Sequence, residues 1–192
     1  MRILAGTHKG RKLLSPPGRS RTRPITGAVK KSLFGMLGDR VRGAAVVDLY
    51  CGTGTLGLEA LSRGARACWF VERSGEVLRR LRRNIEALGL ADCCTVWPGS
   101  VTVALARRLG ELTGGVDLAF VDPPYAAARR WSWPGAVDTI FSPLARRLAP
   151  GGVVVLRLPR QVEPPEVLGE LAVQRLRRYG EMVLALLGPT EA

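Results

Sequence analysis

The sequence is poor in the residues that build metal centres and disulfide frameworks. It contains one histidine, His8, and its four cysteines, Cys51, Cys68, Cys93 and Cys94, show no C-x-x-C spacing. We therefore expect neither a zinc site nor a disulfide-bonded fold. The cysteines are predicted to be reduced thiols, mostly in the core.

Long apolar runs are also missing. No run approaches the roughly 18 residues of a membrane span, and the first 14 residues mix Arg2, Lys9, Arg11 and Lys12 into the stretch that a signal peptide would keep apolar. The chain is therefore predicted to be cytoplasmic, without membrane contact. Its 192 residues, 46% of them hydrophobic, are enough for one well-buried core and few for two.

Acidic residues are scarce near the N-terminus. Residues 1–42 hold 11 basic residues and one acidic residue, Asp39, a net charge of +10, whereas the other 150 residues hold 18 basic and 15 acidic residues, a net charge of +3. A basic segment attached to a nearly neutral domain suits a polyanion such as RNA or DNA. An ordinary solvated face is the alternative. The polyanion is favoured because five basic residues follow the turn-forming "SPPG" closely, namely Arg19, Arg21, Arg23, Lys30 and Lys31.

Strand and helix patterns alternate from Ala44 onward. Apolar runs predict strands at 44–50, 67–72, 94–97, 116–121 and 153–158, with helices near 55–64, 74–89, 101–109 and 136–148. Ser74 is a plausible N-cap and Gly89 a plausible end of the second of these helices. Repeated β-α units predict a parallel sheet with helices on both faces. The segments "LAVQRLRRY" and "EMVLALL" predict an antiparallel hairpin at the sheet edge, which gives a mostly parallel, seven-stranded, Rossmann-like α/β fold.

A glycine pattern follows the first predicted strand. Gly52, Gly54 and Gly57 spell G-x-G-x-x-G, and Glu72 lies 20 residues after Gly52 at the tip of the next strand. Such a loop lets the backbone approach a ligand closely, and the acid can accept hydrogen bonds from ribose hydroxyls. The pattern alone fits either a dinucleotide or S-adenosylmethionine. Asp48, just before the loop, favours S-adenosylmethionine, because a carboxylate suits an ammonium group and repels a pyrophosphate; the alternative role of Asp48 is to cap the loop.

A second motif, Asp122-Pro123-Pro124-Tyr125, ends the strand predicted at 116–121. D-P-P-Y after a strand is typical of methyltransferases that act on exocyclic amino groups of bases. Such an amine is a poor nucleophile, because its lone pair is delocalised into the ring. Hydrogen bonds from the amine to the Asp122 side chain and the Pro123 carbonyl would aim the lone pair at the methyl group, and Tyr125 can stack on the extruded base. The alternative, a proline-stiffened loop with a surface aspartate, leaves the match in both position and residue type unexplained.

The chain resembles the bacterial RsmD-type methyltransferases, which methylate a guanine N2 in small-subunit (16S) ribosomal RNA. The resemblance covers nearly the whole chain and rests on "MRILAGTHKGRKLLSPPG", "TRPITGAVKKSLFGML", "DLYCGTGTLGLEALSRGA", "DPPY" and "YGEMVLAL". It implies a class I S-adenosylmethionine-dependent methyltransferase with an N-terminal β-hairpin extension. Residues 1–26 would then form a basic hairpin and arm that contact RNA, and residues 27–192 the methyltransferase domain.

The resemblance also implies the site residues by position. Cofactor contacts are expected from Thr22, Arg23, Pro24, Asp48, Tyr50, Cys51, Gly52, Thr53, Gly54, Glu72, Arg73, Ser100 and Asp122, with the first three near the methionine end of the cofactor. RNA contacts are expected from Arg11, Lys12, Arg19 and Arg21, and the catalytic group from Asp122, Pro123, Pro124 and Tyr125, without a metal. The chain departs from the family pattern at Gly27 and Lys31, where acids are usual, and at Ser100, where an acid usually binds the adenine amine.

These patterns together predict a monomeric enzyme that methylates guanine N2 in 16S ribosomal RNA, within small-subunit or assembly particles. Two alternatives stay open. One is an amino-methyltransferase that acts on another RNA, on DNA adenine or on a protein side chain. The other is a catalytically silent RNA-binding module, against which the intact glycine loop and DPPY motif argue.

Overall fold

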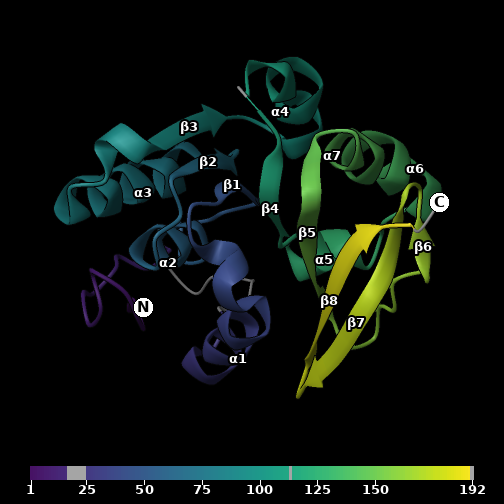
Figure 1. Ribbon diagram of the computed structural model, residues 1–192, viewed down its shortest axis with the longest axis horizontal. Coiled ribbons are helices and arrows are strands. Elements are labelled where there is room, and N and C mark those ends of the chain that lie inside the picture. The colour runs from purple at the N-terminus through teal and green to yellow at the C-terminus, as the bar shows by residue number, and fades with distance from the viewer. Residues whose placement is uncertain (17–24, 113, 191–192) are drawn as a thin grey trace.

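The β-α units build one eight-stranded sheet with helices on both faces (Figure 1). The computed structural model describes residues 1–16, 25–112 and 114–190. The strand order is β3-β2-β1-β4-β5-β8-β7-β6, with parallel pairing among the first five strands of that order. In chain order the elements are α1 (Gly27–Leu37), η1 (Gly38–Val41), β1 (Ala45–Leu49), α2 (Gly57–Ser62), β2 (Ala67–Glu72), α3 (Gly75–Leu88), η2 (Ala91–Cys93), β3 (Cys94–Pro98), α4 (Val101–Arg108), η3 (Leu109–Glu111), β4 (Val116–Val121), α5 (Tyr125–Ala128), α6 (Trp133–Ala136), η4 (Val137–Phe141), α7 (Ser142–Ala145), β5 (Leu148–Pro159), β6 (Val167–Leu168), β7 (Leu171–Tyr179) and β8 (Met182–Pro189).

Local signals place the elements around the predicted ligand loop correctly. β2 spans Ala67–Glu72, the residues predicted for the second strand. The Ser74 hydroxyl accepts a hydrogen bond from the N–H of Val77, and Gly89 ends α3 in the left-handed region with φ +65°. Both predicted caps of α3 are therefore confirmed.

The region after α5 differs from the prediction. The helix expected near 136–148 lies at 133–145 instead. It consists of α6, a π-helical segment (η4) and α7, which ends at Ala145. β5 then begins at Leu148, because Leu148 already pairs with Val116 before the register shifts along β4. The edge strand β6 is two residues long, too short for any periodicity to reveal, and it makes the sheet eight-stranded instead of seven-stranded.

Both chain ends fold as hairpins of different kinds. β7 and β8 form the predicted antiparallel hairpin, and β8 pairs with β5, so that Arg157 faces Leu184 across the two strands. The N-terminal segment also turns back on itself, but its β pairing in the described residues is a single antiparallel bridge between Arg2 and Lys12.

Alternate residues of each central strand enter two buried clusters, one on each face of the sheet. On β1, Val46 joins the cluster under α1, α2 and α3, and Val47 joins the cluster under α4 and α7. Ile3 and Leu13 of the N-terminal segment are buried in the first cluster. The basic segment therefore packs against the helices on one face of the sheet and extends the core.

Two further expectations concern thiols and membranes. Cys51 and Cys68 are buried and Cys93 and Cys94 partly buried, all as free thiols. Within the described part of the chain, none of the helices combines the length and the apolarity that crossing a membrane would require.

Candidate active site

The carboxyl ends of β1 and β4 meet at the centre of the sheet. The chain winds from β1 through β2 to β3 in one direction and then resumes with β4 on the other side of β1. Asp48 lies beside Phe120 in the parallel pairing, and the N–H of Asp122 donates to the carbonyl of Leu49 at 3.4 Å. Open α/β sheets bind ligands at such a switch point. The glycine loop and the DPPY corner are thereby brought together.

The loop after β1 has a strained backbone. Tyr50 has φ +57° and is the one non-glycine residue of the described segments in the left-handed region; Gly52 has the same φ and Gly54 has φ +85°. Such a conformation costs a tyrosine on the order of 1 kcal/mol or more, and strain of this kind clusters at functional sites. The loop geometry is therefore a reason to look for a ligand here.

The three glycines of the loop have different structural roles. A Cβ at Gly54 would lie 2.5 Å from Cδ1 of Leu81, and a Cβ at Gly57 would lie 2.4 Å from Cε1 of Phe70, so packing against the protein requires both glycines. Around Gly52 no described atom beyond its chain neighbours lies within 4 Å of that position. Gly52 is thus the glycine whose open side is available to a ligand.

Asp48 is a buried carboxyl at the base of the loop, 1% exposed. Its Oδ2 accepts a hydrogen bond from the N–H of Gly57 at 2.8 Å, so the capping role considered from the sequence is real. Burial raises the pKa of Asp48 to about 8; the Gly57 hydrogen bond opposes this shift, and the charges of Asp122 and Glu72 add to it. A cationic ligand group nearby would favour the ionised form.

Glu72 connects the loop to the start of α3. Its Oε2 accepts from the N–H of Gly52 at 3.2 Å, and its Oε1 accepts from the N–H of Ser74 at 2.8 Å. A carboxylate can accept about four hydrogen bonds, so capacity for ribose hydroxyls remains. Ser100, which is exposed, follows the end of β3, next to Glu72, whose carbonyl accepts from the N–H of Gly99 at 3.0 Å.

The remaining predicted cofactor residues of the loop are buried to different degrees. Burial raises the pKa of the Cys51 thiol, which is therefore neutral. Burial also raises the pKa of Tyr50 to about 12, and the nearby charge of Arg73 opposes that shift. Thr53 is 2% exposed, and its hydroxyl has no hydrogen-bond partner among the described residues. A buried hydroxyl without a partner is costly, which fits a site completed by a polar ligand.

The DPPY corner turns the chain from β4 into the short helix α5. Pro123 is buried, and Pro124 stands at the N-cap position of α5, where its carbonyl accepts from the N–H of Ala127 at 2.8 Å. The Pro123 carbonyl receives no hydrogen bond within the described segments. Tyr125 is half-buried at the first position of α5, next to Asp122, whose side chain is 15% exposed.

Sequence reasoning missed one residue of this corner. Arg157 on β5 places its Nε 2.5 Å from Oδ1 of Asp122, and its guanidinium carbon lies 5.5 Å from the centre of the Tyr125 ring. Burial raises the pKa of Asp122, and the charge and hydrogen bond of Arg157 oppose that shift. The available signal was a single arginine inside the apolar run "VVVLRL", since a buried charge is almost always paired.

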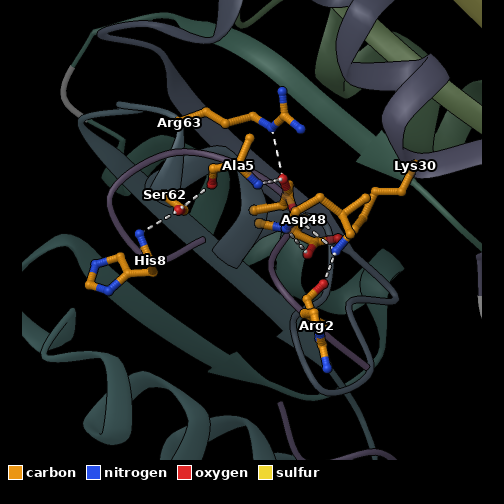
Figure 2. A network of polar contacts seen from close by, with 10 residues as sticks. Arg2, Ala5, His8, Lys30, Asp48, Ser62 and Arg63 are labelled. Atoms are coloured by element: carbon orange, nitrogen blue, oxygen red, sulfur yellow. Dashed lines mark hydrogen bonds and ion pairs between the residues drawn. The ribbon is translucent and has the colours of Figure 1, made fainter. Parts of the chain in front are cut away.

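A buried polar network fixes the N-terminal segment to α2 (Figure 2). Glu59 is fully buried and accepts hydrogen bonds from the N–H groups of Leu4 and Ala5, at 2.8 and 3.1 Å. Its carboxylate also pairs with Lys30 and with Arg63, each at 2.8 Å. Lys30 had been grouped with the charges offered to a polyanion. That expectation is wrong for Lys30, because its side chain is 3% exposed and already neutralises Glu59.

The exposed charges of the N-terminal segment continue onto α3. Arg11 donates to the carbonyl of Ala87 at 2.7 Å, and Lys12 is exposed at the bridge with Arg2. α3 adds Arg79, Arg82 and Arg83, which are exposed and make no ion pair with the described part of the chain. Of the other predicted residues, Thr22, Arg23 and Pro24 near the cofactor and Arg19 and Arg21 near RNA lie outside the described residues.

The described residues contain no group of three or more His, Cys, Asp or Glu side chains that could hold a metal ion. The site therefore consists of carboxylates, backbone groups, hydroxyls, a tyrosine and an arginine around a strained loop.

Known proteins are similar to this chain in sequence and in fold. The chain is 35% identical over 180 residues to a Bacillus subtilis protein named "Putative rRNA methyltransferase YlbH", with 94% of each chain covered. It is 33% identical over 127 residues to "Ribosomal RNA small subunit methyltransferase D" of Escherichia coli, a match that covers 65% of this chain and 60% of the relative. The solved structure "Putative methyltransferase yhhF from Escherichia coli" superposes with a TM-score of 0.82 at 27% identity, covering 100% of this chain and 99% of the other.

The structural neighbours are class I methyltransferases, and the expected fold class is thereby confirmed. The family model described as "Conserved hypothetical protein 95" matches residues 1–188, nearly the whole chain. The chain therefore belongs to that family, the RsmD family.

Proposed function

We propose that the chain transfers a methyl group from S-adenosylmethionine to the exocyclic N2 amine of a guanine in 16S ribosomal RNA. Membership of the RsmD family and the names of its relatives support methyl transfer to ribosomal RNA. The observation that carries the proposal is the placement of Asp122 beside the glycine loop, where Asp48 and Glu72 also converge. A base-orienting group and a cofactor-binding group thus share one switch point.

The loop residues fit S-adenosylmethionine better than a dinucleotide. A cationic sulfonium or ammonium group next to Asp48 and Glu72 would favour the ionised form of Asp48, whose pKa burial otherwise raises to about 8, whereas a pyrophosphate would be disfavoured there. Glu72 would hold the ribose hydroxyls, Gly52 offers its open side, and the Thr53 hydroxyl needs a polar partner. When bound there, the cofactor would supply the methyl group on an activated, positively charged sulfur.

The DPPY corner would prepare the amine. Asp122 and the Pro123 carbonyl are two acceptors at adjacent positions, so they can take both hydrogens of one NH2 group and direct its lone pair away from the ring. The same acceptors would stabilise the positive charge that develops on nitrogen as the N–CH3 bond forms and the S–CH3 bond breaks, and Asp122 would accept the released proton directly or through water. Tyr125, whose ring lies near the guanidinium of Arg157, would stack on the extruded base.

The surface of the N-terminal segment and α3 would hold the RNA. Arg11 donates to the carbonyl of Ala87 near the end of α3, and α3 also carries Arg79 and Arg83, an exposed i, i+4 pair of like charges that is unfavourable without an anionic partner. The N-cap residue of α3, Ser74, donates its N–H to Glu72, so the first turn of α3 lies next to the predicted cofactor site. We propose that residues 1–26 contact RNA, that residues 27–192 bind the cofactor and the base, and that the protein acts as a monomer on small-subunit or assembly particles.

An acceptor comparison tests the proposal against its rivals. The purified chain is supplied with tritiated S-adenosylmethionine and with small-subunit particles, protein-free ribosomal RNA, duplex DNA or a protein mixture, and labelled RNA is digested for mass spectrometry of its nucleosides. The expected product is N2-methylguanosine from ribosomal RNA. Label in DNA or protein alone would support the alternative amino-methyltransferase. RNA binding without any binding of S-adenosylhomocysteine would support a silent RNA-binding module.

A further inference from the structure

A buried arginine lies next to the DPPY corner in a strand that is otherwise apolar. Arg157 stands between Leu156 and Leu158, both fully buried, and its own side chain is 5% exposed. Replacing a buried ion pair by well-packed apolar side chains is often neutral or stabilising. Packing alone therefore does not explain why the strand carries a charge at this position.

Arg157 contacts both side chains of the motif that would handle the target base. Its Nε is 2.5 Å from Oδ1 of Asp122, and its guanidinium lies over the ring of Tyr125. Among the described residues, Oδ2 of Asp122 receives no hydrogen bond. The carboxylate therefore has one oxygen held by the protein and one oxygen available to a substrate.

We propose that Arg157 is a positioning residue for methyl transfer: it holds Oδ1 of Asp122, so that Oδ2 faces the target amine, and it keeps this carboxylate ionised. The inference rests on the proposed function, in which Asp122 accepts a hydrogen bond from the amine. It adds a residue that the DPPY motif does not contain.

Two physical effects support this assignment. A charge-assisted hydrogen bond from a side chain that is itself fixed by packing restricts rotation of the carboxyl group, which keeps its free oxygen at one place. A positive charge in contact with a buried carboxyl also favours its ionised form, in which both oxygens are strong acceptors and neither carries a proton. Loss of Arg157 should therefore impair Asp122 in two separable ways.

The test is a double-substitution cycle followed across pH. Single-turnover methyl transfer is measured for the unsubstituted protein, Arg157→Met, Asp122→Asn and the double variant, with calorimetric binding of S-adenosylhomocysteine as the check on folding. Arg157→Lys keeps the charge and loses the planar donor group. The matched control is Arg160→Met, an exposed arginine just after β5 that bonds the Gly180 carbonyl at 3.5 Å.

Arg157→Met should lower the rate about 10- to 100-fold near neutral pH, because once the pKa of Asp122 exceeds the pH of the assay, each further unit of rise removes about tenfold of its ionised form. The rate should recover as the pH is raised, since the carboxyl ionises above its raised pKa. In the Asp122→Asn background the same substitution should cost little and add no pH dependence. Arg157→Lys should lose part of the rate at every pH without the recovery at high pH, and Arg160→Met should match the unsubstituted protein.

Among the described residues, the titratable groups that act on Asp122 are Arg157 from β5 and Asp48 from β1, and Tyr125 of α5 lies against Arg157. Asp48 contributes a pH dependence of its own, but that contribution persists when Asp122 is replaced, so the cycle separates the two. A loss that is equal in both backgrounds, or that does not change with pH, overturns the inference and leaves Arg157 a packing residue. Transfer to no acceptor at all would overturn the proposed function together with the inference, whereas transfer without coupling overturns the inference alone.

Discussion

Replacing Glu72 by alanine should weaken binding of S-adenosylmethionine by about 1.5 to 3 kcal/mol, the scale of hydrogen bonds to a charged group. The structure refines this expectation, because Glu72 already accepts one N–H from Gly52 and one from Ser74. The substitution therefore removes the predicted ribose acceptor and also an anchor of the glycine loop. The expected change in the dissociation constant is about 10- to 150-fold.

The two contributions can be separated. Glu72→Gln keeps one carbonyl oxygen and can hold either the loop or the ribose, but not both, so its loss of affinity should fall between the unsubstituted protein and the alanine variant. The matched control is Glu76→Ala in the first turn of α3, whose carboxylate is 54% exposed and lies 3.9 Å from Arg80. An exposed pair of this kind contributes about 0 to 1 kcal/mol, so Glu76→Ala should bind normally.

Calorimetric titration with S-adenosylmethionine and S-adenosylhomocysteine measures these affinities, and thermal unfolding of each variant without ligand measures the anchoring. Normal affinity of Glu72→Ala, accompanied by lower stability, would refute the ribose contact and reduce Glu72 to a loop anchor. Tight binding of NAD with no binding of S-adenosylhomocysteine would refute the cofactor assignment itself.

Three further predictions follow from the same geometry. Asp122→Ala should lower single-turnover methyl transfer roughly a hundredfold or more while cofactor affinity barely moves; a near-normal rate would remove Asp122 from the mechanism. Charge reversal at Arg11 and Lys12 should flatten the salt dependence of RNA binding by a slope of about 0.7 to 0.9 per lost phosphate contact, whereas reversal at the exposed Arg108 of α4 should leave the slope unchanged. Because burial raises the pKa of Asp48 to about 8, binding of the ammonium-bearing cofactor should strengthen as the pH rises through that value, and Asp48→Asn should lose this dependence in calorimetry.

The same shift of Asp48 predicts how stability varies with pH. An aspartate has a pKa of about 3.9 when unfolded, whereas the folded group holds its proton up to about pH 8. The folded state therefore binds more protons than the unfolded state between these values, and this residue lowers the stability of the ligand-free protein as the pH rises through that window. A thermal unfolding series of Asp48→Asn should be flatter than that of the unsubstituted protein over the same range.

Short-range signals explain why so much of the ligand loop could be predicted. The apolar run at 67–72, the Ser74 cap and the glycines of 52–57 each act within a few residues, and the structure has each element at the predicted place. The end of the helix predicted near 136–148 was misplaced for the opposite reason, because the helical residues run from 133 to 145. Leu148 joins the sheet because it pairs with Val116 of β4. That pairing partner is distant in the sequence, so the residue pattern within 136–148 does not indicate it.

The missed parts of the site are pairs of charges from distant segments. Arg157 lies on β5 and Asp122 directly follows the neighbouring strand β4, whereas Lys30 and Glu59 lie on two helices. Neither pair therefore shows a recognisable spacing in the sequence. The sequence does show that a charged residue such as Arg157 or Glu59 stands among apolar residues. Burial of such a charge implies a partner, but only the sheet order tells which one.

The short helix α2 links the basic segment to the predicted cofactor loop. Its first residue, Gly57, donates its N–H to Asp48, whereas Glu59, two residues later, accepts hydrogen bonds from the backbone of Leu4 and Ala5 (Figure 2). Charge divides the chain after residue 42, yet packing does not follow that division, because Ile3 is buried in the same cluster as the helices of the larger part. A phosphate contact on the N-terminal segment would therefore sit at a fixed distance from the methyl-transfer site. RNA bound by Arg11 and Lys12 would be placed relative to Asp122 by the folded core itself, so changes in this segment should alter which nucleotide reaches the site as well as how tightly RNA binds.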